Sequence, residues 1–495
     1  MMKKILIIGG GISGISAGIY AQKAGFESVI YEKNKVAGGQ CMGWNRREYH
    51  IDNCMHWLTG TKEGTGLRKL WEDLGALGDK VNFIKTEKFY SSELDGKQVT
   101  LWRDLLRTEK ELLEISPEDA EEIHEFISYV KLAECCEMPV EKPMDMMGIK
   151  DYINLGKKMS GMIKVIRKYG KINIEDMSKR FKSPLLQRLI TDYLPKEYIA
   201  SSFIASFATV VSGNGELPAG GSLAMTNRMI DRYKKLGGLI HTGISAEKVK
   251  INDNKADGII LSDGTFDLAD YVICATDTAE AFGKLIGKSY MNKAWETCYR
   301  SREDYPLFSS FQMAFSIDSS AFDIDNTLFF NCEPLTVGKT TVQRMSVKSY
   351  SYEPSFAPQG KTVLQANIMQ KEDDYLYWKS LDKDQYKKQK SYAAQEVMER
   401  IVQRFPKLNN CIELLDSWTP LTYEHYCNSY RGAYMSFISK KNIKAHRFTG
   451  KLKGLSNVFL ASQWMMAPGG LPVAASEGKF AVQRILKAEK MSYEL

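Results

Sequence analysis

The hydrophobic pattern at the start of the chain alternates between strand-like and helix-like segments. Residues 3–8 form a short isoleucine-rich run, which predicts a buried strand. Residues 12–25 have the small and apolar composition of a helix, and residues 28–31 form a second apolar run that ends on Glu32. The glycine-rich turn 9–14 connects the first strand to the helix. A strand, glycine turn, helix, strand and acid in this order predict a dinucleotide-binding unit.

Three glycines of this turn each have a physical role in such a unit. Gly9 permits the tight turn, Gly11 lets a pyrophosphate approach the backbone, and Gly14 lets the helix pack closely on the strand. The amino end of the helix supplies free N–H groups and partial positive charge for the phosphates. Glu32 suits a bidentate hydrogen bond to an adenosine ribose and would repel a 2′-phosphate, so NADP is not expected here.

Further glycine turns follow at three places along the chain. The pair Gly38-Gly39 precedes Gln40, and residues 218–222 open a helix that ends at 237–238 before a series of strands up to residue 276. Near the carboxyl end, residues 455–464 read as a strand, 465–472 as a turn and 473–487 as a helix, with Pro472 near its first turn.

With these segments the sequence resembles the phytoene desaturase-like flavoproteins, within the wider group that includes amine oxidases and retinol saturase. The resemblance rests on the first glycine turn, on Gly38-Gly39, on residues 48–58 and on the terminal turn. It implies FAD as the cofactor, with the adenine beside Ala246. It also implies that the turn containing Gln463, Gly470 and Leu471 binds the flavin, whose pyrimidine faces the amino end of the last helix.

Two positions depart from the pattern of that family. Gln40 stands where an arginine is commoner, and Ser462-Gln463 stand where many members have Gly-Asp. Gln463 can still exchange hydrogen bonds with a ribityl hydroxyl or a phosphate, but it carries no charge.

The resemblance implies an α/β fold in which a Rossmann-like FAD-binding domain is assembled from separated segments. We expect this domain to comprise residues 1–75, 216–282 and 450–495. Residues 101–215 look largely helical and are expected to form an insertion. Residues 283–430 mix apolar strands with a helix around 384–404, which predicts an α+β substrate-binding domain with an antiparallel sheet.

Composition narrows the class of protein. The chain has 495 residues, of which 44% are hydrophobic and 26% charged, as in ordinary globular proteins. The net charge of +7 is mild, and no concentrated basic face with aromatic platforms predicts nucleic-acid binding. The nine cysteines and six histidines show no metal-ligand spacing, so no metal site is expected.

The sequence also bears on localisation. Unpaired, scattered cysteines are typical of reduced thiols in a cytoplasm. The apolar start of the chain fits a core strand better than a secretory signal, and no apolar run reaches the length of about eighteen residues that a bilayer requires. Residues 155–168 combine apolar positions at helical spacing with lysines and arginines. They predict either a helix lying on an anionic membrane surface or an ordinary amphipathic surface helix.

Proton-transfer candidates come from segments that the resemblance brings to the flavin. His56 is the first catalytic candidate, because a neutral imidazole exchanges protons near pH 7; a core histidine bonded to a backbone carbonyl is the alternative. Trp57, Trp464, Met465 and Met466 are expected to form an apolar wall beside the substrate, or else plain core.

Three classes of function fit these features. The leading one is an FAD-dependent oxidoreductase that desaturates or saturates C–C bonds of a lipophilic, isoprenoid-like substrate, with an amine oxidase as a rival within this class. The second is a redox-neutral isomerase or hydratase, and the third a non-enzymatic prenyl-lipid carrier. Because the chain has one GxGxxG turn, no nicotinamide domain is predicted, and oxygen, a quinone, a ferredoxin or diffusing NAD(P)H are all allowed as the electron partner.

Overall fold

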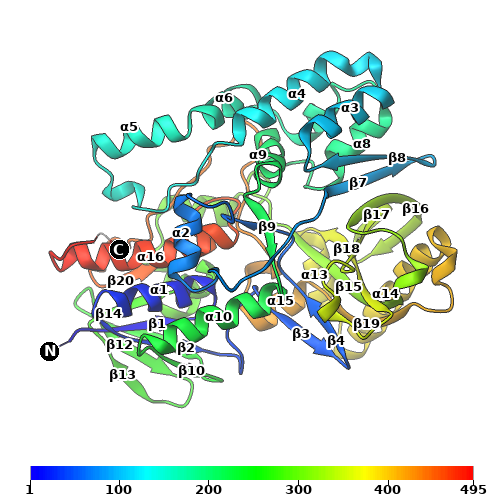
Figure 1. The fold of residues 1–495 in the computed structure, drawn as a ribbon. Helices are drawn as coiled ribbons and strands as arrows, with labels where there is room; N and C mark the ends of the chain where they lie inside the picture. Colours follow the sequence, from blue (N-terminus) through cyan, green and yellow to red (C-terminus); the bar gives the residue numbers. More distant parts are fainter. Residues whose placement is uncertain (1, 494) are drawn as a thin grey trace.

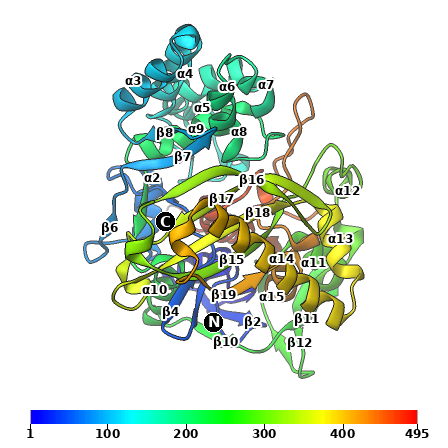
Figure 2. The ribbon, with the colours of Figure 1, turned by 90° about the vertical axis from the view of Figure 1, so that its right-hand side faces the viewer.

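A computed structural model describes residues 2–493 and 495 of the chain. A parallel sheet with its helices, a larger mixed sheet and a layer of helices make up the structure (Figures 1 and 2). Short strands connect these parts: β3 (Gly43–Arg46) pairs with β4 (Tyr49–Asp52), and β9 (Gly215–Pro218) pairs with β5 (Leu58–Thr59) and β6 (Phe83–Ile84).

The parallel sheet is built from segments that lie far apart in the sequence. Its strand order is β10-β2-β1-β14-β20, and every neighbouring pair is parallel. The strands are β1 (Lys4–Ile8), β2 (Glu27–Glu32), β10 (Leu239–Thr242), β14 (Tyr271–Cys274) and β20 (Val458–Leu460). The predicted α/β Rossmann-like fold class is therefore confirmed.

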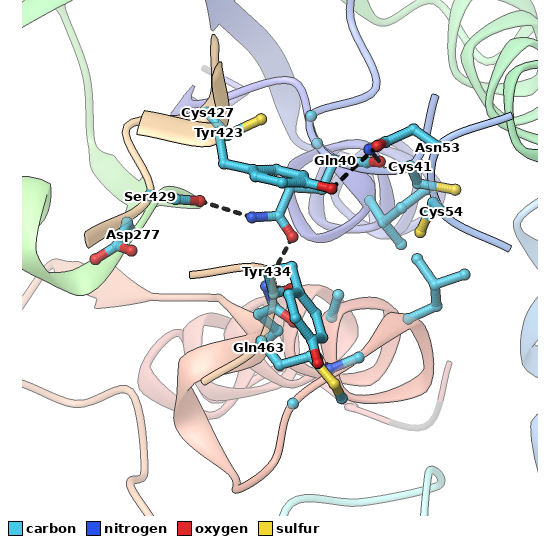
Figure 3. Close-up of a pocket in the computed structure, with 18 of the residues that line it drawn as sticks. Gln40, Cys41, Asn53, Cys54, Asp277, Tyr423, Cys427, Ser429, Tyr434 and Gln463 are labelled. Atoms are coloured by element: carbon cyan, nitrogen blue, oxygen red, sulfur yellow. Dashed lines mark hydrogen bonds between the residues drawn. The ribbon is translucent and has the colours of Figure 1, made fainter. Parts of the chain in front are cut away.

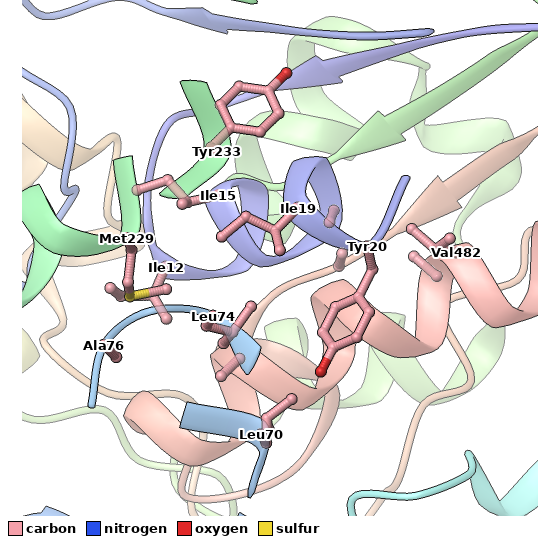
Figure 4. Packing of buried hydrophobic residues seen from close by; sticks show 14 of the residues in the cluster. Ile12, Ile15, Ile19, Tyr20, Leu70, Leu74, Ala76, Met229, Tyr233 and Val482 are labelled. Atoms are coloured by element: carbon pink, nitrogen blue, oxygen red, sulfur yellow. The ribbon is translucent and has the colours of Figure 1, made fainter. Parts of the chain in front are cut away.

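Alternating side chains of β1 point to opposite faces of this sheet, as the period of a strand requires. Leu6 and Ile8 pack against a small antiparallel sheet of β11 (Ala246–Asn252), β12 (Lys255–Leu261) and β13 (Phe266–Leu268). Ile5 and Ile7 face a cluster formed with the helices α1 (Ile12–Lys23), α10 (Gly221–Lys235) and α16 (Leu471–Ala488). In this cluster, side chains of the three helices and of α2 (Gly66–Asp73) interlock (Figure 4).

The first and last long helices of the chain touch through small residues. Ser13 and Ser16 of α1 donate hydrogen bonds to the carbonyls of Ala474 (2.8 Å) and Ala475 (2.6 Å) in α16. A Cβ added to Gly478 would lie 2.3 Å from the Ser13 carbonyl oxygen, which no real side chain tolerates. Only glycine at position 478 therefore permits this close approach.

The larger sheet has seven strands in the order β19-β15-β18-β17-β16-β7-β8, and all neighbours are antiparallel except β16 and β7. The strands are β7 (Lys88–Leu94), β8 (Lys97–Trp102), β15 (Ser309–Asp318), β16 (Thr327–Val337), β17 (Thr340–Ser349), β18 (Lys361–Gln370) and β19 (Glu413–Trp418). Residues 76–100 belong to none of the expected domains, yet they contain β7 and most of β8, which extend this sheet. Its outer face packs on α14 (Lys383–Arg404).

Helices occupy most of the segment between β8 and β9 (Figure 1). They are α3 (Leu105–Ile115), α4 (Ala120–Ala133), α5 (Ile149–Lys158), α6 (Ser160–Tyr169), α7 (Ile174–Ser178), α8 (Pro184–Asp192) and α9 (Ala200–Val211). The α-helices not yet named lie in the second half of the chain: α11 (Thr278–Glu280), α12 (Lys293–Arg300), α13 (Glu372–Ser380) and α15 (Pro420–Cys427).

The amphipathic segment 155–168 is divided between α5 and α6 rather than forming one helix. In this segment Val165 is fully buried, whereas Ile163 and Ile166 are 44% and 48% exposed. Contact of this surface with a membrane stays a prediction. Among the described residues, no helix combines the length and the apolar character that crossing a bilayer demands.

A single methyl group added at Gly478 tests the contact between α1 and α16. We expect Gly478→Ala to lower the free energy of unfolding by about 1–3 kcal/mol, because the helices must separate to admit the Cβ. The matched control is Gly156→Ala in α5, where the added Cβ meets no heavy atom within 4 Å. That variant should be neutral or gain up to about 1 kcal/mol from helix propensity. Urea unfolding measures both, and equal effects of the two substitutions would contradict the packing described here.

Candidate functional site

One large cavity, of about 980 Å³, begins at the glycine turn after β1 and ends at the seven-stranded sheet and the helical layer. It brings together residues from five separate stretches of the chain, 8–59, 193–206, 243–285, 310–369 and 423–474, which Figure 3 shows in part. The predicted site residues that line it are Gly9, Gly11, Glu32, Gly38, Gly39, Gln40, His56, Ala246, Gln463, Gly470 and Leu471. Gly14 is the one predicted site residue that does not line it.

The three glycines of the first turn that were predicted as site residues meet different surroundings. Gly9 has a φ of +104°, and a Cβ there would lie 2.7 Å from the Ala275 carbonyl oxygen. A Cβ on Gly14 would lie 1.9 Å from the Gly9 carbonyl oxygen, so this glycine serves the packing of α1 on β1. Around Gly11 the nearest atom to an added Cβ is the Gly39 Cα at 3.8 Å. The protein itself would tolerate a side chain at position 11, so the space beside it is available to a ligand.

Two helix amino ends open into the same cavity. α1 follows Gly11, and α16 follows Gly470, which has a φ of +95° that favours glycine. Gly11, Gly470 and the first residues of each helix line the cavity. Free backbone N–H groups and the partial positive charge of both helices therefore point to a bound anion or to electron-rich oxygen atoms.

Glu32 is a buried carboxylate at the end of β2. Its Oε2 accepts the N–H of Gly10 at 2.8 Å, and its Oε1 accepts the backbone N–H of Asn34 at 2.8 Å and the side-chain amide at 2.7 Å. These contacts fix the carboxylate at the cavity wall between the glycine turn and the strand end. The remaining lone pairs can accept hydrogen bonds from ribose hydroxyls.

The two departures from the family pattern contact each other. Gln463 Nε2 donates to Gln40 Oε1 at 3.4 Å, while Gln40 Nε2 donates to Ser429 Oγ at 2.6 Å (Figure 3). Gln463 Oε1 accepts the N–H of Gly470 at 2.9 Å, which ties this pair to the start of α16. A neutral amide pair thus occupies the place where the resemblance implied charged residues.

His56 follows a turn rather than lying on a strand, because β4 ends at Asp52 and β5 begins at Leu58. The turn is held by Asp52 Oδ1, which accepts the N–H groups of Cys54 (3.0 Å) and Met55 (3.1 Å). The imidazole lies on the cavity wall and is exposed to the cavity. Desolvation by the surrounding protein, together with the charge of Lys348, lowers the pKa of His56 to about 3. His56 is therefore a neutral imidazole throughout the physiological pH range.

Sequence reasoning did not identify several groups of the cavity wall. Asp277 accepts the N–H groups of Ala279 and Tyr430, and burial raises its pKa to about 7. Lys348 and Asn367 come from the inner face of the seven-stranded sheet. Period-two alternation in residues 340–349 indicates two faces of a strand, but it does not reveal which face meets the cavity.

The expected apolar wall is present only in part. Trp57 and Trp464 line the cavity, whereas Met465 is fully buried within the core beside the parallel sheet. Polar side chains of the larger sheet line the end of the cavity near His56 instead: Ser310, Gln312, Thr327, Ser346, Lys348, Gln365 and Asn367.

Comparisons with known proteins agree with this arrangement. The family model for flavin containing amine oxidoreductase matches residues 12–486. A 4,4'-diaponeurosporene oxygenase of Staphylococcus aureus is 22% identical, with 98% of each chain covered. Two solved structures share the fold: an oxidoreductase from Methanosarcina mazei (TM-score 0.59, 17% identity, covering 98% of this chain and 100% of that one) and the cyclohexylamine oxidase of Brevibacterium oxydans (TM-score 0.59, 14% identity, 99% and 100%).

The fold and the cavity define a dinucleotide-binding flavoprotein. The chain belongs to the flavin-containing amine oxidoreductase family, since the family model spans nearly all of it. FAD is the cofactor of this family's chemistry, and the open space at Gly11 and the two helix amino ends suit its pyrophosphate and flavin.

Filling the space beside Gly11 tests the cofactor site. Gly11→Val should abolish FAD retention while the protein stays folded, because the added atoms enter the cavity and not the protein interior. Glu32→Ala should weaken FAD binding by roughly ten- to a hundredfold, the effect of losing hydrogen bonds to a charged group. Glu27→Ala, at the other end of β2, is the matched control. Absorbance of the bound flavin after gel filtration measures retention, and full flavin content in the Gly11→Val protein would refute the assignment.

The protonation state of His56 gives a pH-dependent prediction. Because its pKa in the folded protein lies below the ordinary value near 6.5, the unfolded chain binds the proton more tightly. The contribution of His56 to stability is therefore complete above pH 6.5 and is lost as the pH falls toward 3. In a proton–carbon NMR titration, the His56 signal, assigned by its loss in His56→Gln, should not move between pH 8 and pH 5. A midpoint near 6.5 would contradict this.

Proposed function

We propose that this FAD-dependent oxidoreductase desaturates or saturates C–C bonds of a lipophilic, isoprenoid-like substrate. One observation carries the proposal: a single cavity continues from the dinucleotide turn at Gly11 to His56 and the inner face of the seven-stranded sheet. A cofactor and a substrate can therefore meet inside the protein, away from bulk water. The staphylococcal relative, which is named as an oxygenase of 4,4'-diaponeurosporene, supports a lipophilic substrate.

We assign the parts of the cofactor to the residues that suit them. Glu32 and Ala246 would hold the adenosine, and Gly11, Gly38-Gly39 and the amino end of α1 would hold the pyrophosphate. Gln40, Gln463 and the amino end of α16 would hold the flavin. All of these residues line one cavity.

Bound FAD supplies the redox chemistry, since it accepts or donates a hydride or single electrons. The chain supplies orientation and electrostatics. The amino end of α16, begun by Gly470 and Leu471, stabilises negative charge at its end of the cavity. His56 remains the catalytic candidate; with a pKa of about 3 it acts as a neutral hydrogen-bond donor and acceptor rather than as a cationic acid.

Oxidation of an amine is the rival activity suggested by the family name and by the cyclohexylamine oxidase fold. Lys348 disfavours it, because a buried cation at the end of the cavity repels an ammonium group. A redox-neutral isomerase or hydratase uses the same residues and differs only in its electron balance. A non-enzymatic lipid carrier fits poorly with a cavity that retains Glu32 and the open space at Gly11.

The colour of the bound flavin provides the test. If the enzyme desaturates, a fraction of a lipid extract should bleach the purified oxidised protein under anaerobic conditions. If it saturates, the same kind of fraction should restore the colour of the reduced protein. In either case the lipid product should differ from its substrate by two hydrogen atoms. His56→Ala should keep the flavin but slow this step. Turnover of a lipid without any change in flavin colour would favour the redox-neutral class. A reaction confined to polar amines would contradict the proposal.

A further inference from the structure

The inner face of the seven-stranded sheet presents polar side chains in two rows across its strands. In one row Ser346 of β17 lies opposite Asn367 of β18, and in the next row Lys348 lies opposite Gln365. All four line the cavity. Cross-strand neighbours and their diagonals are close enough for long side chains to reach one common group. The sheet therefore forms a polar wall at the end of a cavity that would need none for a plain hydrocarbon.

Lys348 is the most costly of these groups to bury. Its side chain is 7% exposed, and no carboxylate among the described residues forms an ion pair with it. Its Nζ has one long hydrogen bond, to the Met55 carbonyl oxygen at 3.4 Å, and it lies 4.7 Å from the centre of the Tyr350 ring. Burial lowers the pKa of Lys348 to about 8, so the amine is still largely charged at neutral pH.

Asp52 is the nearest acidic group but does not neutralise this cation. Its Oδ2 accepts the N–H of Ser222 at 2.6 Å, and its Oδ1 accepts the Ser222 hydroxyl at 2.7 Å. It also accepts the N–H groups of the turn that carries His56. The Asp52 carboxylate thus accepts hydrogen bonds at the start of α10 and attracts Lys348 only electrostatically, without a hydrogen bond to it. Burying a cation without a partner is unfavourable unless a ligand supplies the opposite charge.

Asn367 is a second polar group whose side chain makes no hydrogen bond to the described residues. Its amide oxygen is shielded from solvent and would need a donor, so an anion does not satisfy it. Its amide N–H groups are the atoms that can donate to a ligand in the cavity. Ser346, directly across from it, contributes a hydroxyl to the same part of the wall.

Apolar groups surround this polar patch. Phe329 and Met369 come from the neighbouring strands, and Trp57 and Tyr193 also line the cavity. The Tyr193 ring stacks on Tyr90, with ring centres 4.8 Å apart, and its centre lies 6.3 Å from that of the Phe329 ring. The end of the cavity is therefore suited to a molecule that is mostly apolar but carries one compact polar group.

We propose that Lys348, Asn367 and Ser346 bind the carboxylate of an otherwise apolar substrate. The carboxylate supplies the charge that Lys348 lacks and accepts hydrogen bonds from the Asn367 amide and the Ser346 hydroxyl, while the apolar remainder lies against Phe329 and Trp57. This rests on the proposed function and narrows its substrate class from a hydrocarbon to a lipophilic carboxylic acid. The three residues determine specificity and orient the substrate; they take no part in the redox step.

Three probes with one chain length test the head-group preference: dodecanoate, 1-dodecanol and dodecylamine. Isothermal titration of the FAD-loaded protein at pH 7 should give affinities in the order acid, alcohol, amine, with the acid bound roughly tenfold or more tightly than the alcohol. Lys348→Met keeps the side-chain length and should abolish this difference. Asn367→Leu should reduce it several-fold.

Lys97→Met is the matched control, since Lys97 lies on the same sheet but is exposed at the end of β8. It should keep the full preference for the acid. Equal affinities for acid and alcohol in wild-type protein, or an undiminished preference in Lys348→Met, would overturn the carboxylate site. Flavin content is measured first on every sample. A protein that cannot hold FAD contradicts the proposed function, whereas a flavin-loaded protein without head-group preference contradicts this inference alone.

Discussion

The close contact between the first and the last long helix is the constraint on which the site depends. Gly478 removes the side chain that would hold α1 and α16 apart, and Ser13 and Ser16 add hydrogen bonds across the gap. Because the helices pack this closely, the amino ends that follow Gly11 and Gly470 open into one cavity. Segments separated by almost the whole length of the chain thus become two sides of one cofactor site.

The side chains in the middle of the cavity are mostly uncharged. Where the family resemblance implied charged groups, Gln40 and Gln463 form a neutral hydrogen-bonded pair. Asp277 sits in low-dielectric surroundings that raise its pKa, and those around His56 keep its imidazole neutral. Lys348 is the exception, a buried cation without an ion pair in the described part of the chain. That contrast is why we propose that it, rather than an apolar wall, lies at the substrate end.

Sequence patterns correctly predicted those structural features that depend on residues close together in the chain. The glycine turn, the strand ending on Glu32 and the helix after Gly470 follow from residues close together in the chain, and they were found where expected. The Rossmann-like fold class was predicted correctly for this reason. The roles of single site residues, including His56, stay predictions.

Tertiary contacts decided what the sequence could not reveal. The hydrogen bond between Gln463 and Gln40 joins residues far apart in the sequence, so no local sequence pattern could predict it. β7 and β8 were missed because a polar hairpin becomes part of a sheet only when β16 lies beside it. Lys348 lies between Val347 and Ser349 on its strand, and only the assembled sheet shows that its side faces the cavity.

Joint binding of one dinucleotide by both ends of the chain is the central claim, and a comparison of cofactor fragments tests it most directly. Protein stripped of flavin is titrated with FAD, with FMN and with ADP. The account predicts tight binding of FAD and binding weaker by several orders of magnitude for each fragment, because each engages only one of the two helix ends. FMN that binds as tightly as FAD, or a protein that binds neither, would contradict it.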